Sequence, residues 1–119
     1  MRFLIVDDTA RARQSMKALL GVWHPLEELR EAANGAEAVQ FAEEFQPDII
    51  LMDARMPGMS GLEATRLIKA KWPQIKIIIL SVFTDYLALA MEAGADAFIS
   101  KSDPPEKLRE AVNNILLAE

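Results

Sequence analysis

The feature that most constrains the fold is an alternation of short aliphatic runs with longer segments of helical period. The runs cover residues 2–6, 28–32, 48–52, 76–80 and 97–100. Two stretches, 49–52 and 75–80, are almost continuously apolar, which is typical of strands buried on both faces of a parallel sheet. Strands that alternate with helices in this way predict a parallel sheet covered by helices on both sides.

The segments between the runs carry apolar stripes with the spacing of an amphipathic helix. These stripes are Ala12, Met16, Leu19 and Leu20; Ala38, Ala42 and Phe45; and Leu108, Val112, Ile115 and Leu116. Asn34-Gly35 is a turn signal, and Gly94 is a C-terminal stop. Ser60, with Glu63 three residues later, predicts a capping box at the start of a helix.

Five strand–helix units therefore make up the chain. A closed barrel needs eight such units, so an open sheet is the better prediction. We expect an α/β fold with a five-stranded parallel sheet in the flavodoxin-like order 2-1-3-4-5, a (βα)5 architecture. With 119 residues, 51% of them hydrophobic, the chain has the size and apolar content of one domain spanning residues 1–119.

Composition excludes several classes of partner. Eighteen acidic and 13 basic residues give a net charge of −5, which disfavours direct binding to nucleic acid or to an anionic membrane surface. There is no cysteine, so neither disulfides nor thiolate metal sites can form. The apolar run at residues 3–6 is too short for a signal peptide or a membrane span, and we expect a cytoplasmic protein.

Charged and hydroxyl side chains follow the predicted strands. In open α/β sheets, ligands bind beyond the carboxyl ends of the strands, at the point where strand order reverses. Asp7 and Asp8 follow the first strand and Asp53 follows the third, the two strands that flank that point. Ser81 and Lys101 follow the fourth and fifth strands.

Each of these residues has an ordinary structural explanation when it is taken alone. Asp7 and Asp8 could cap the first helix, Asp53 could belong to a turn, and Lys101 could be a solvated lysine. Together, however, three converging carboxylates would repel one another and raise each other's pKa. A divalent cation with oxygen ligands, Mg²⁺ or Mn²⁺, would offset that repulsion, so the joint functional interpretation is favoured.

The predicted site suits phosphoryl transfer. An aspartate carboxylate can accept a phosphoryl group as an aspartyl phosphate, and catalysis then consists mainly of positioning and charge neutralisation. Lys101 would pair with one phosphoryl oxygen and the Ser81 hydroxyl would donate to another. No residue is placed as a general base, and the single histidine, His24, is expected to be an ordinary surface residue.

At these positions the sequence resembles the receiver domain of two-component response regulators. The resemblance covers essentially the whole chain. It rests on Ile5-Val6-Asp7-Asp8, on Leu51 to Gly61 with Asp53 and Met56-Pro57, on Leu80-Ser81, on Glu92 to Ala97, and on Lys101. It implies that Asp53 is the phosphoacceptor and that Mg²⁺ is held by Asp8, by Asp53 and by the backbone carbonyl of Arg55, with Asp7 acting largely through water.

The resemblance also implies a switch. Ser81 would be the switch hydroxyl, Lys101 the phosphate-pairing lysine, and Phe98 the switch aromatic, although Phe98 could simply pack in the core. The phosphodonor would be a sensor histidine kinase or a phosphotransfer protein. Ser102 replaces the proline that often follows the lysine, a pattern similar to receivers that precede a LuxR-type DNA-binding domain. The resemblance predicts a signalling module and not an enzyme that turns over small molecules.

The predicted fourth helix has an unusual composition. Residues 86–91 carry no charge, whereas a helix on a sheet should have a polar outer face. Two explanations are open: a short, mostly buried helix, or a surface for a partner or a second copy of this chain, formed with strand five and helix five.

Other functions remain as alternatives. A haloacid-dehalogenase-like phosphohydrolase also uses a strand-end aspartate and Mg²⁺, but its two aspartates are one residue apart on the first strand, whereas Asp7 and Asp8 are adjacent. A flavodoxin-like cofactor domain would need a hydroxyl- and glycine-rich phosphate loop after the first strand, where this chain has acidic residues. A degenerate receiver that only binds proteins is disfavoured by the intact set of Asp53, Ser81 and Lys101.

Overall fold

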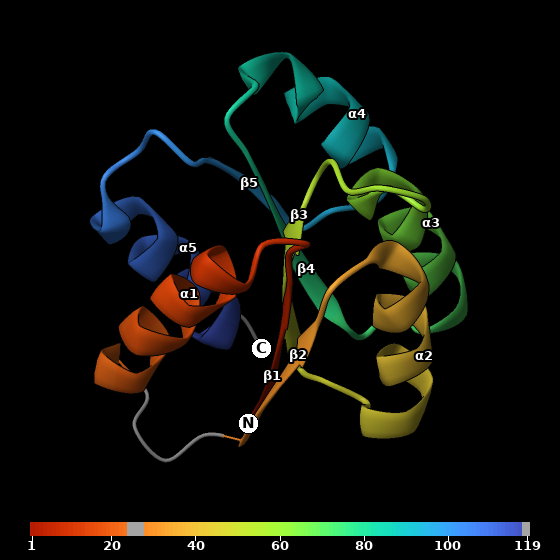
Figure 1. Ribbon diagram of the computed structural model, residues 1–119, viewed down its shortest axis with the longest axis horizontal. Helices are drawn as coiled ribbons and strands as arrows, with labels where there is room; N and C mark the ends of the chain where they lie inside the picture. Colours follow the sequence, from red (N-terminus) through yellow and green to blue (C-terminus); the bar gives the residue numbers. More distant parts are fainter. Residues whose placement is uncertain (24–27, 118–119) are drawn as a thin grey trace.

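Five strands and their intervening helices alternate along the chain, as the computed structural model shows for residues 1–23 and 28–117 (Figure 1). In chain order the elements are β1 (Arg2–Val6), α1 (Ala10–Trp23), β2 (Glu28–Ala32), α2 (Gly35–Phe45), β3 (Ile49–Asp53), α3 (Gly61–Lys71), β4 (Lys76–Ser81), the 3₁₀ turn η1 (Thr84–Tyr86), α4 (Leu87–Glu92), β5 (Ala97–Ser100) and α5 (Pro105–Leu117). The expectation for His24 falls outside the described residues.

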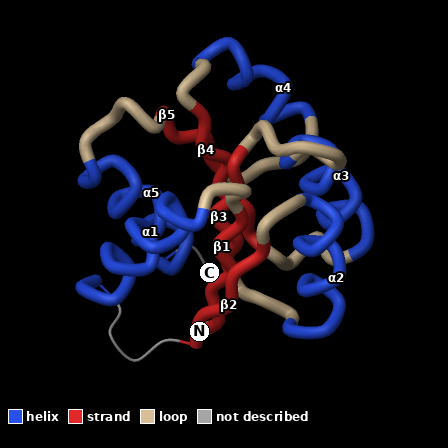
Figure 2. Tube along the Cα trace, viewed as in Figure 1, coloured by secondary structure: helices blue, strands red, loops and turns tan. Residues whose placement is uncertain are grey.

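All strand pairs are parallel, and the sheet order β2-β1-β3-β4-β5 confirms the predicted fold. Helices α1 and α5 cover one face of the sheet, and α2, α3 and α4 cover the other (Figures 1 and 2). Strands β1 and β3 are neighbours in the middle, with Val6 opposite Met52. This register places the ends of β1 and β3 at the same edge, where Asp7, Asp8 and Asp53 follow or end the strands.

The core lies in two layers, one on each face of the sheet. Ile50, Met52, Ile77 and Ile79 point toward α2, α3 and α4, whereas Leu51, Ile78 and Leu80 point toward α1 and α5. These seven side chains are at most 4% exposed, because successive residues of a strand face opposite sides and both sides are covered. The continuous apolar sequence of β3 and β4 is thereby explained.

Two helices begin with side-chain caps. The Ser60 hydroxyl accepts a hydrogen bond from the Glu63 amide at 3.1 Å, which confirms the predicted N-cap of α3. Asn34 does more than form a turn: its Oδ1 accepts from the Glu37 amide at 2.8 Å, and Glu37 Oε1 accepts from the Ala33 amide at 2.7 Å. Such reciprocal bonds satisfy amides that have no partner within the helix.

The structure differs from the expected elements at the start of one strand and on the surface of one helix. Strand β3 begins one residue later than predicted and includes Asp53, and β4 extends to Ser81. The interpretation of α4 as mostly buried is wrong, because Leu87, Leu89 and Met91 are 45% to 49% exposed. The described part of the chain contains no cis peptide bond, so the bond before Ser102 is trans.

At the end of the sheet opposite the carboxylates, one lysine links several segments through hydrogen bonds. Lys69 Nζ, on α3, donates to the carbonyls of Pro73 and Ile75 at 3.0 and 2.9 Å and to Asp96 at 3.1 Å. Asp96 in turn accepts from the Ile77 amide at 2.8 Å. This cluster links α3, the start of β4 and the segment before β5. Separately, no helix in residues 1–23 and 28–117 is long and apolar enough to cross a membrane.

Candidate phosphoacceptor site

Three carboxylates meet where β1 and β3 end. Asp7 and Asp8 follow β1, Asp53 is the last residue of β3, and one carboxylate oxygen from each lies within 4.8 Å of the other two. Their burial differs: Asp7 is 7% exposed, Asp53 is partly buried and Asp8 is exposed. The convergence expected from the sequence is therefore present, and the outermost carboxylate faces solvent.

A lysine approaches this cluster from the loop after β5. Lys101 Nζ lies 3.0 Å from Asp7 Oδ2 and 3.3 Å from Asp53 Oδ1. Its backbone amide donates to the Ser81 carbonyl at 2.8 Å, which continues the pairing of β4 with β5 and fixes where the side chain starts. One ammonium group thus contacts two of the three carboxylates.

Burial and charge oppose each other in this cluster. Burial raises the pKa of Asp53; the nearby Lys101 works against this, and the charges of Asp7 and Asp8 add to it. Burial alone would lower the pKa of Lys101, but its hydrogen bond with Asp7 and the charge of Asp53 outweigh that effect and raise it. Burial, with a smaller contribution from the two neighbouring carboxylates, therefore outweighs Lys101, and the ionised form of Asp53 is less favoured than in a free aspartate.

The oxygen donors fit a hard divalent cation. Mg²⁺ typically binds one or two protein carboxylates and completes its shell with water and phosphate oxygens. Asp8 and Asp53, with Asp7 behind them, supply such carboxylates. Because the raised pKa of Asp53 comes partly from like charge, a bound cation would relieve it.

Every polar atom of Asp7 takes part in a hydrogen bond. Its amide donates to the Ala32 carbonyl at 3.1 Å, and its Oδ1 accepts from the Thr9 amide at 2.9 Å. Its Oδ2 accepts from Lys101, and its carbonyl accepts from Arg13 Nη1 at 2.7 Å. Arg13 could not be identified from the sequence, because it is one of several basic residues on α1 and belongs to no motif.

Ser81 lies beside Asp53 at the end of β4 and is 2% exposed. Its Oγ accepts a hydrogen bond from the Phe83 amide at 3.0 Å. The Arg55 guanidinium lies over the Phe83 ring, 5.4 Å from its centroid. These residues, together with Asp53, Val82 and Lys101, line a pocket of about 240 Å³, which has room for a small anion beside the carboxylate.

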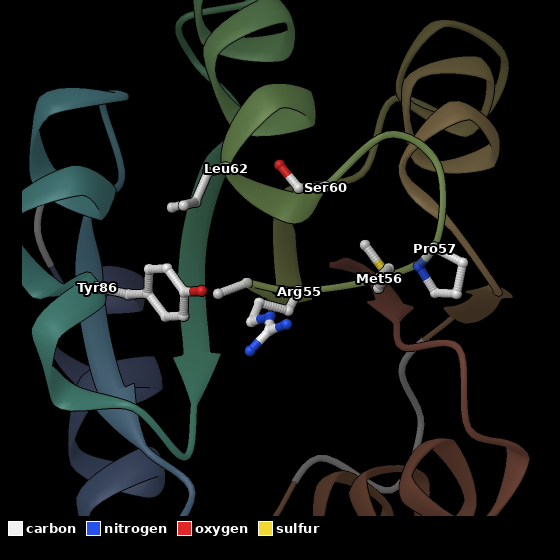
Figure 3. Close-up of a pocket in the computed structure, with 7 residues that line it drawn as sticks. Arg55, Met56, Pro57, Ser60, Leu62 and Tyr86 are labelled. Carbon is white, nitrogen blue, oxygen red and sulfur yellow. The ribbon is translucent and has the colours of Figure 1, made fainter.

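A second, larger cavity of about 640 Å³ adjoins the site but contains none of the three carboxylates. Arg55, Met56 and Pro57 line it from the loop after β3, and Leu62 and Tyr86 from α3 and η1 (Figure 3). It leaves free space between that loop and the segment that leads into α4. Phe98 is partly buried and packs on the same side of the sheet as α4.

The statistical profile of the response regulator receiver domain matches residues 3–113. The chain belongs to the response-regulator receiver family.

Known receivers and regulators resemble this chain over nearly its whole length. The oxygen regulatory protein NreC of Staphylococcus aureus (strain JH9) is 38% identical over 122 residues, covering 100% of this chain and 56% of NreC. A LuxR-family DNA-binding response regulator from Staphylococcus aureus is 32% identical, with a TM-score of 0.86 over 96% of this chain and 97% of that structure. TrrA of Thermotoga maritima, solved in complex with Mg²⁺–BeF, is 33% identical, with a TM-score of 0.85 over 96% and 97% of the two chains.

This receiver spans about half the length of the curated relatives it matches, 53% and 56% for the first two. Those relatives are transcriptional or oxygen regulators. Receiver domains of response regulators are signalling modules of two-component systems, not enzymes that turn over small molecules.

Proposed function

We propose that this receiver accepts a phosphoryl group on Asp53 from a sensor histidine kinase or a phosphotransfer protein. The observation that carries the proposal is the placement of Lys101 between Asp7 and Asp53, beside the third carboxylate. The whole chain, residues 1–119, would act as one receiver domain.

In the transfer step, one Asp53 carboxylate oxygen attacks phosphorus. The phosphorus–nitrogen bond of a phosphohistidine donor breaks, and the imidazole leaves with the electron pair. Lys101 would then move its contact from Asp53 Oδ1 to a phosphoryl oxygen while keeping its contact with Asp7. The Ser81 hydroxyl, already oriented by the Phe83 amide, has its proton free to donate to a second oxygen.

Asp8, Asp53 and the Arg55 carbonyl would hold a Mg²⁺ or Mn²⁺ ion, with Asp7 contributing through water. When bound, this ion would neutralise the carboxylates and one oxygen of the transferred group.

Ser81 offers a mechanical link to the output side of the domain. Because the Phe83 amide is bonded to Ser81 Oγ, a shift of Ser81 toward the phosphoryl group would carry the start of the β4–α4 segment with it. The cavity beside Tyr86 provides space for that segment to move, and Phe98 would turn inward as Ser81 leaves its place. Phosphorylation would thereby shift a two-state equilibrium that already exists.

The output surface would be the face formed by α4, β5 and α5. Three large apolar side chains of α4 are about half exposed there, and Val82 and Phe83 are exposed beside them. A second copy of this chain, or a LuxR-type output domain in a longer regulator, would use this face. The receiver itself would not bind DNA, because its net charge is −5.

Intact-mass spectrometry tests the central step. The chain is incubated with acetyl phosphate and Mg²⁺, beside Asp53→Asn and the matched control Asp85→Asn, an exposed aspartate on η1. We expect the wild type and Asp85→Asn to gain one phosphoryl group and Asp53→Asn to gain none. If the wild type stays unmodified both with acetyl phosphate and with a phosphorylated kinase, the proposal is overturned and the chain is a degenerate receiver. Turnover of a phosphomonoester would instead support the phosphohydrolase.

Chemical-shift mapping tests the output face separately. Beryllofluoride and Mg²⁺ are added to the labelled protein, and amide shifts are recorded along the chain. Shifts at residues 82–99 support the proposed switch, whereas shifts confined to the three carboxylates and Lys101 would remove it. Sedimentation with and without beryllofluoride then reports whether two copies associate.

A further inference from the structure

Arg13 connects three elements at the base of the carboxylate cluster. It extends from α1, donates through Nη1 to the Asp7 carbonyl at 2.7 Å, and donates through Nε to Glu31 Oε1, on β2, at 3.1 Å. Its side chain is only 19% exposed. We propose that Arg13 is a positioning residue for the metal-binding carboxylates, acting through the peptide bond between Asp7 and Asp8; this inference rests on the function proposed above.

The peptide bond explains how one hydrogen bond can place two side chains. The carbonyl of Asp7 lies in the same rigid plane as both Cα atoms and the amide of Asp8. Holding the carbonyl oxygen therefore fixes the orientation of the plane from which both carboxylates extend.

Asp8 depends on this bond more than Asp7 does. Asp7 is also tied through its amide and through both carboxylate oxygens. Within residues 1–23 and 28–117, by contrast, no side chain or amide bonds the Asp8 carboxylate, which faces solvent. The peptide plane is thus the main restraint on where Asp8 presents its oxygens.

An arginine is required for the two contacts. Its planar guanidinium donates in two directions at once and stays protonated, whereas a lysine offers one compact ammonium group. Lys17 provides the comparison: it also pairs with Glu31, at 3.4 Å, but it makes no contact with Asp7.

The direction in which Mg²⁺ affinity changes when Arg13 is removed separates a positioning role from a purely electrostatic one. A cation near a metal site repels Mg²⁺, so removing it would tighten binding if charge were its only role. If Arg13 positions the carboxylates, removing it weakens binding. The loss should be larger for Mg²⁺ than for Ca²⁺, because Mg²⁺ requires near-ideal octahedral geometry and Ca²⁺ tolerates irregular shells. General destabilisation of the fold would weaken both ions alike.

Isothermal titration of the full chain with Mg²⁺ and with Ca²⁺ tests the proposal, using Arg13→Met, Arg13→Lys and the control Lys17→Met. We expect both Arg13 variants to lose about tenfold or more in Mg²⁺ affinity, the range typical of groups that orient metal ligands, with a smaller loss for Ca²⁺. Lys17→Met should behave like the wild type. In metal-free protein, the Asp8 amide resonance should shift in both Arg13 variants and stay in place in Lys17→Met.

The outcomes distinguish this inference from the proposed function. Wild-type protein that ignores Mg²⁺ overturns both. Wild-type binding with unchanged or tighter binding in Arg13→Met, or with equal losses for the two ions, overturns the positioning role alone. If the Arg13 variants do not fold, Glu31→Gln weakens the same chain of contacts more gently; a lower ratio of Mg²⁺ to Ca²⁺ affinity supports the proposal, and an unchanged ratio overturns it.

Discussion

Replacing Gly61 with alanine should damage the fold and the site together. Gly61 is the first residue of α3, and a Cβ atom built on it would lie 1.8 Å from the Asp53 carbonyl oxygen and 2.9 Å from Met52 Cγ. Real Cβ atoms essentially never approach a neighbour closer than 3.0 Å, so α3 and β3 must separate by the difference, about 1.2 Å. The bond from the Gly61 amide to the Ala54 carbonyl, 3.0 Å long, cannot survive such a shift unstrained.

The expected cost follows from these two effects. Overpacking typically costs about 1–3 kcal/mol and a lost backbone hydrogen bond about 1 kcal/mol, so we expect the free energy of unfolding to fall by roughly 2–4 kcal/mol. That is a large part of the ~5–15 kcal/mol that stabilises an ordinary domain. Because the backbone of Asp53 moves, Mg²⁺ affinity and phosphorylation should also fall.

Gly21→Ala is the matched control. Gly21 lies in α1, is exposed, and has nothing within 4 Å of a built Cβ atom. Alanine there should stabilise the protein by about 0.5–1 kcal/mol, since glycine loses more conformational entropy in a helix. Urea unfolding followed by circular dichroism measures both variants. Unfolding free energies that change in the same direction, or a Gly61→Ala protein as stable as the wild type, would refute the reasoning.

Three further predictions concern single side chains. Burial raises the pKa of Asp53 above its ordinary 3.8, so the folded metal-free protein should lose stability as pH rises from that value through the raised pKa. Asp53→Asn should therefore unfold at a higher urea concentration than the wild type at pH 7 but not at pH 3. Equal urea midpoints at pH 7 would contradict this prediction. Ser81→Ala should still accept a phosphoryl group, by intact mass, but should show smaller amide shifts at residues 82–99 with beryllofluoride; an undiminished response would disprove the coupling. Thr65 is fully buried, and its hydroxyl has no partner among the described residues, so Thr65→Val should stabilise the protein by about 1–2 kcal/mol in thermal unfolding, and a loss of stability would show that the hydroxyl is satisfied.

The sheet could be predicted from the sequence because its signals are local and redundant. The continuous apolar runs of β3 and β4 indicate burial on both faces, and parallel topology then places Asp7, Asp8 and Asp53 at one edge. Lys101 follows β5, which pairs with β4 and not with β1 or β3, so the sequence predicts only that it lies at the same end of the sheet as the carboxylates. Its contacts with Asp7 and Asp53 depend on the path of the loop after β5 and could not be predicted.

The features of the site that could not be predicted from the sequence depend on contacts between residues far apart in the chain. Arg13 is one of several basic residues on α1, and only the fold brings it to the Asp7 carbonyl. The stacking of Arg55 on Phe83 joins two loops, so no spacing along the chain reveals it. The outer face of α4 was ambiguous for another reason: residues 86–91 lack charge whether they are buried or exposed, and composition alone cannot distinguish the two.

The hydrogen bonds of Lys69 and Asp96 hold one end of the strands more firmly than the other. The three bonds of Lys69 fasten α3 to the approach to β4, and Asp96 adds the segment before β5, so that end has little freedom to rearrange. At the other end of the strands, Ser81 and Phe83 share one hydrogen bond and line the pocket of about 240 Å³. If Asp53 is phosphorylated as proposed, a displacement at Ser81 would therefore meet less resistance toward α4 than toward the start of β4.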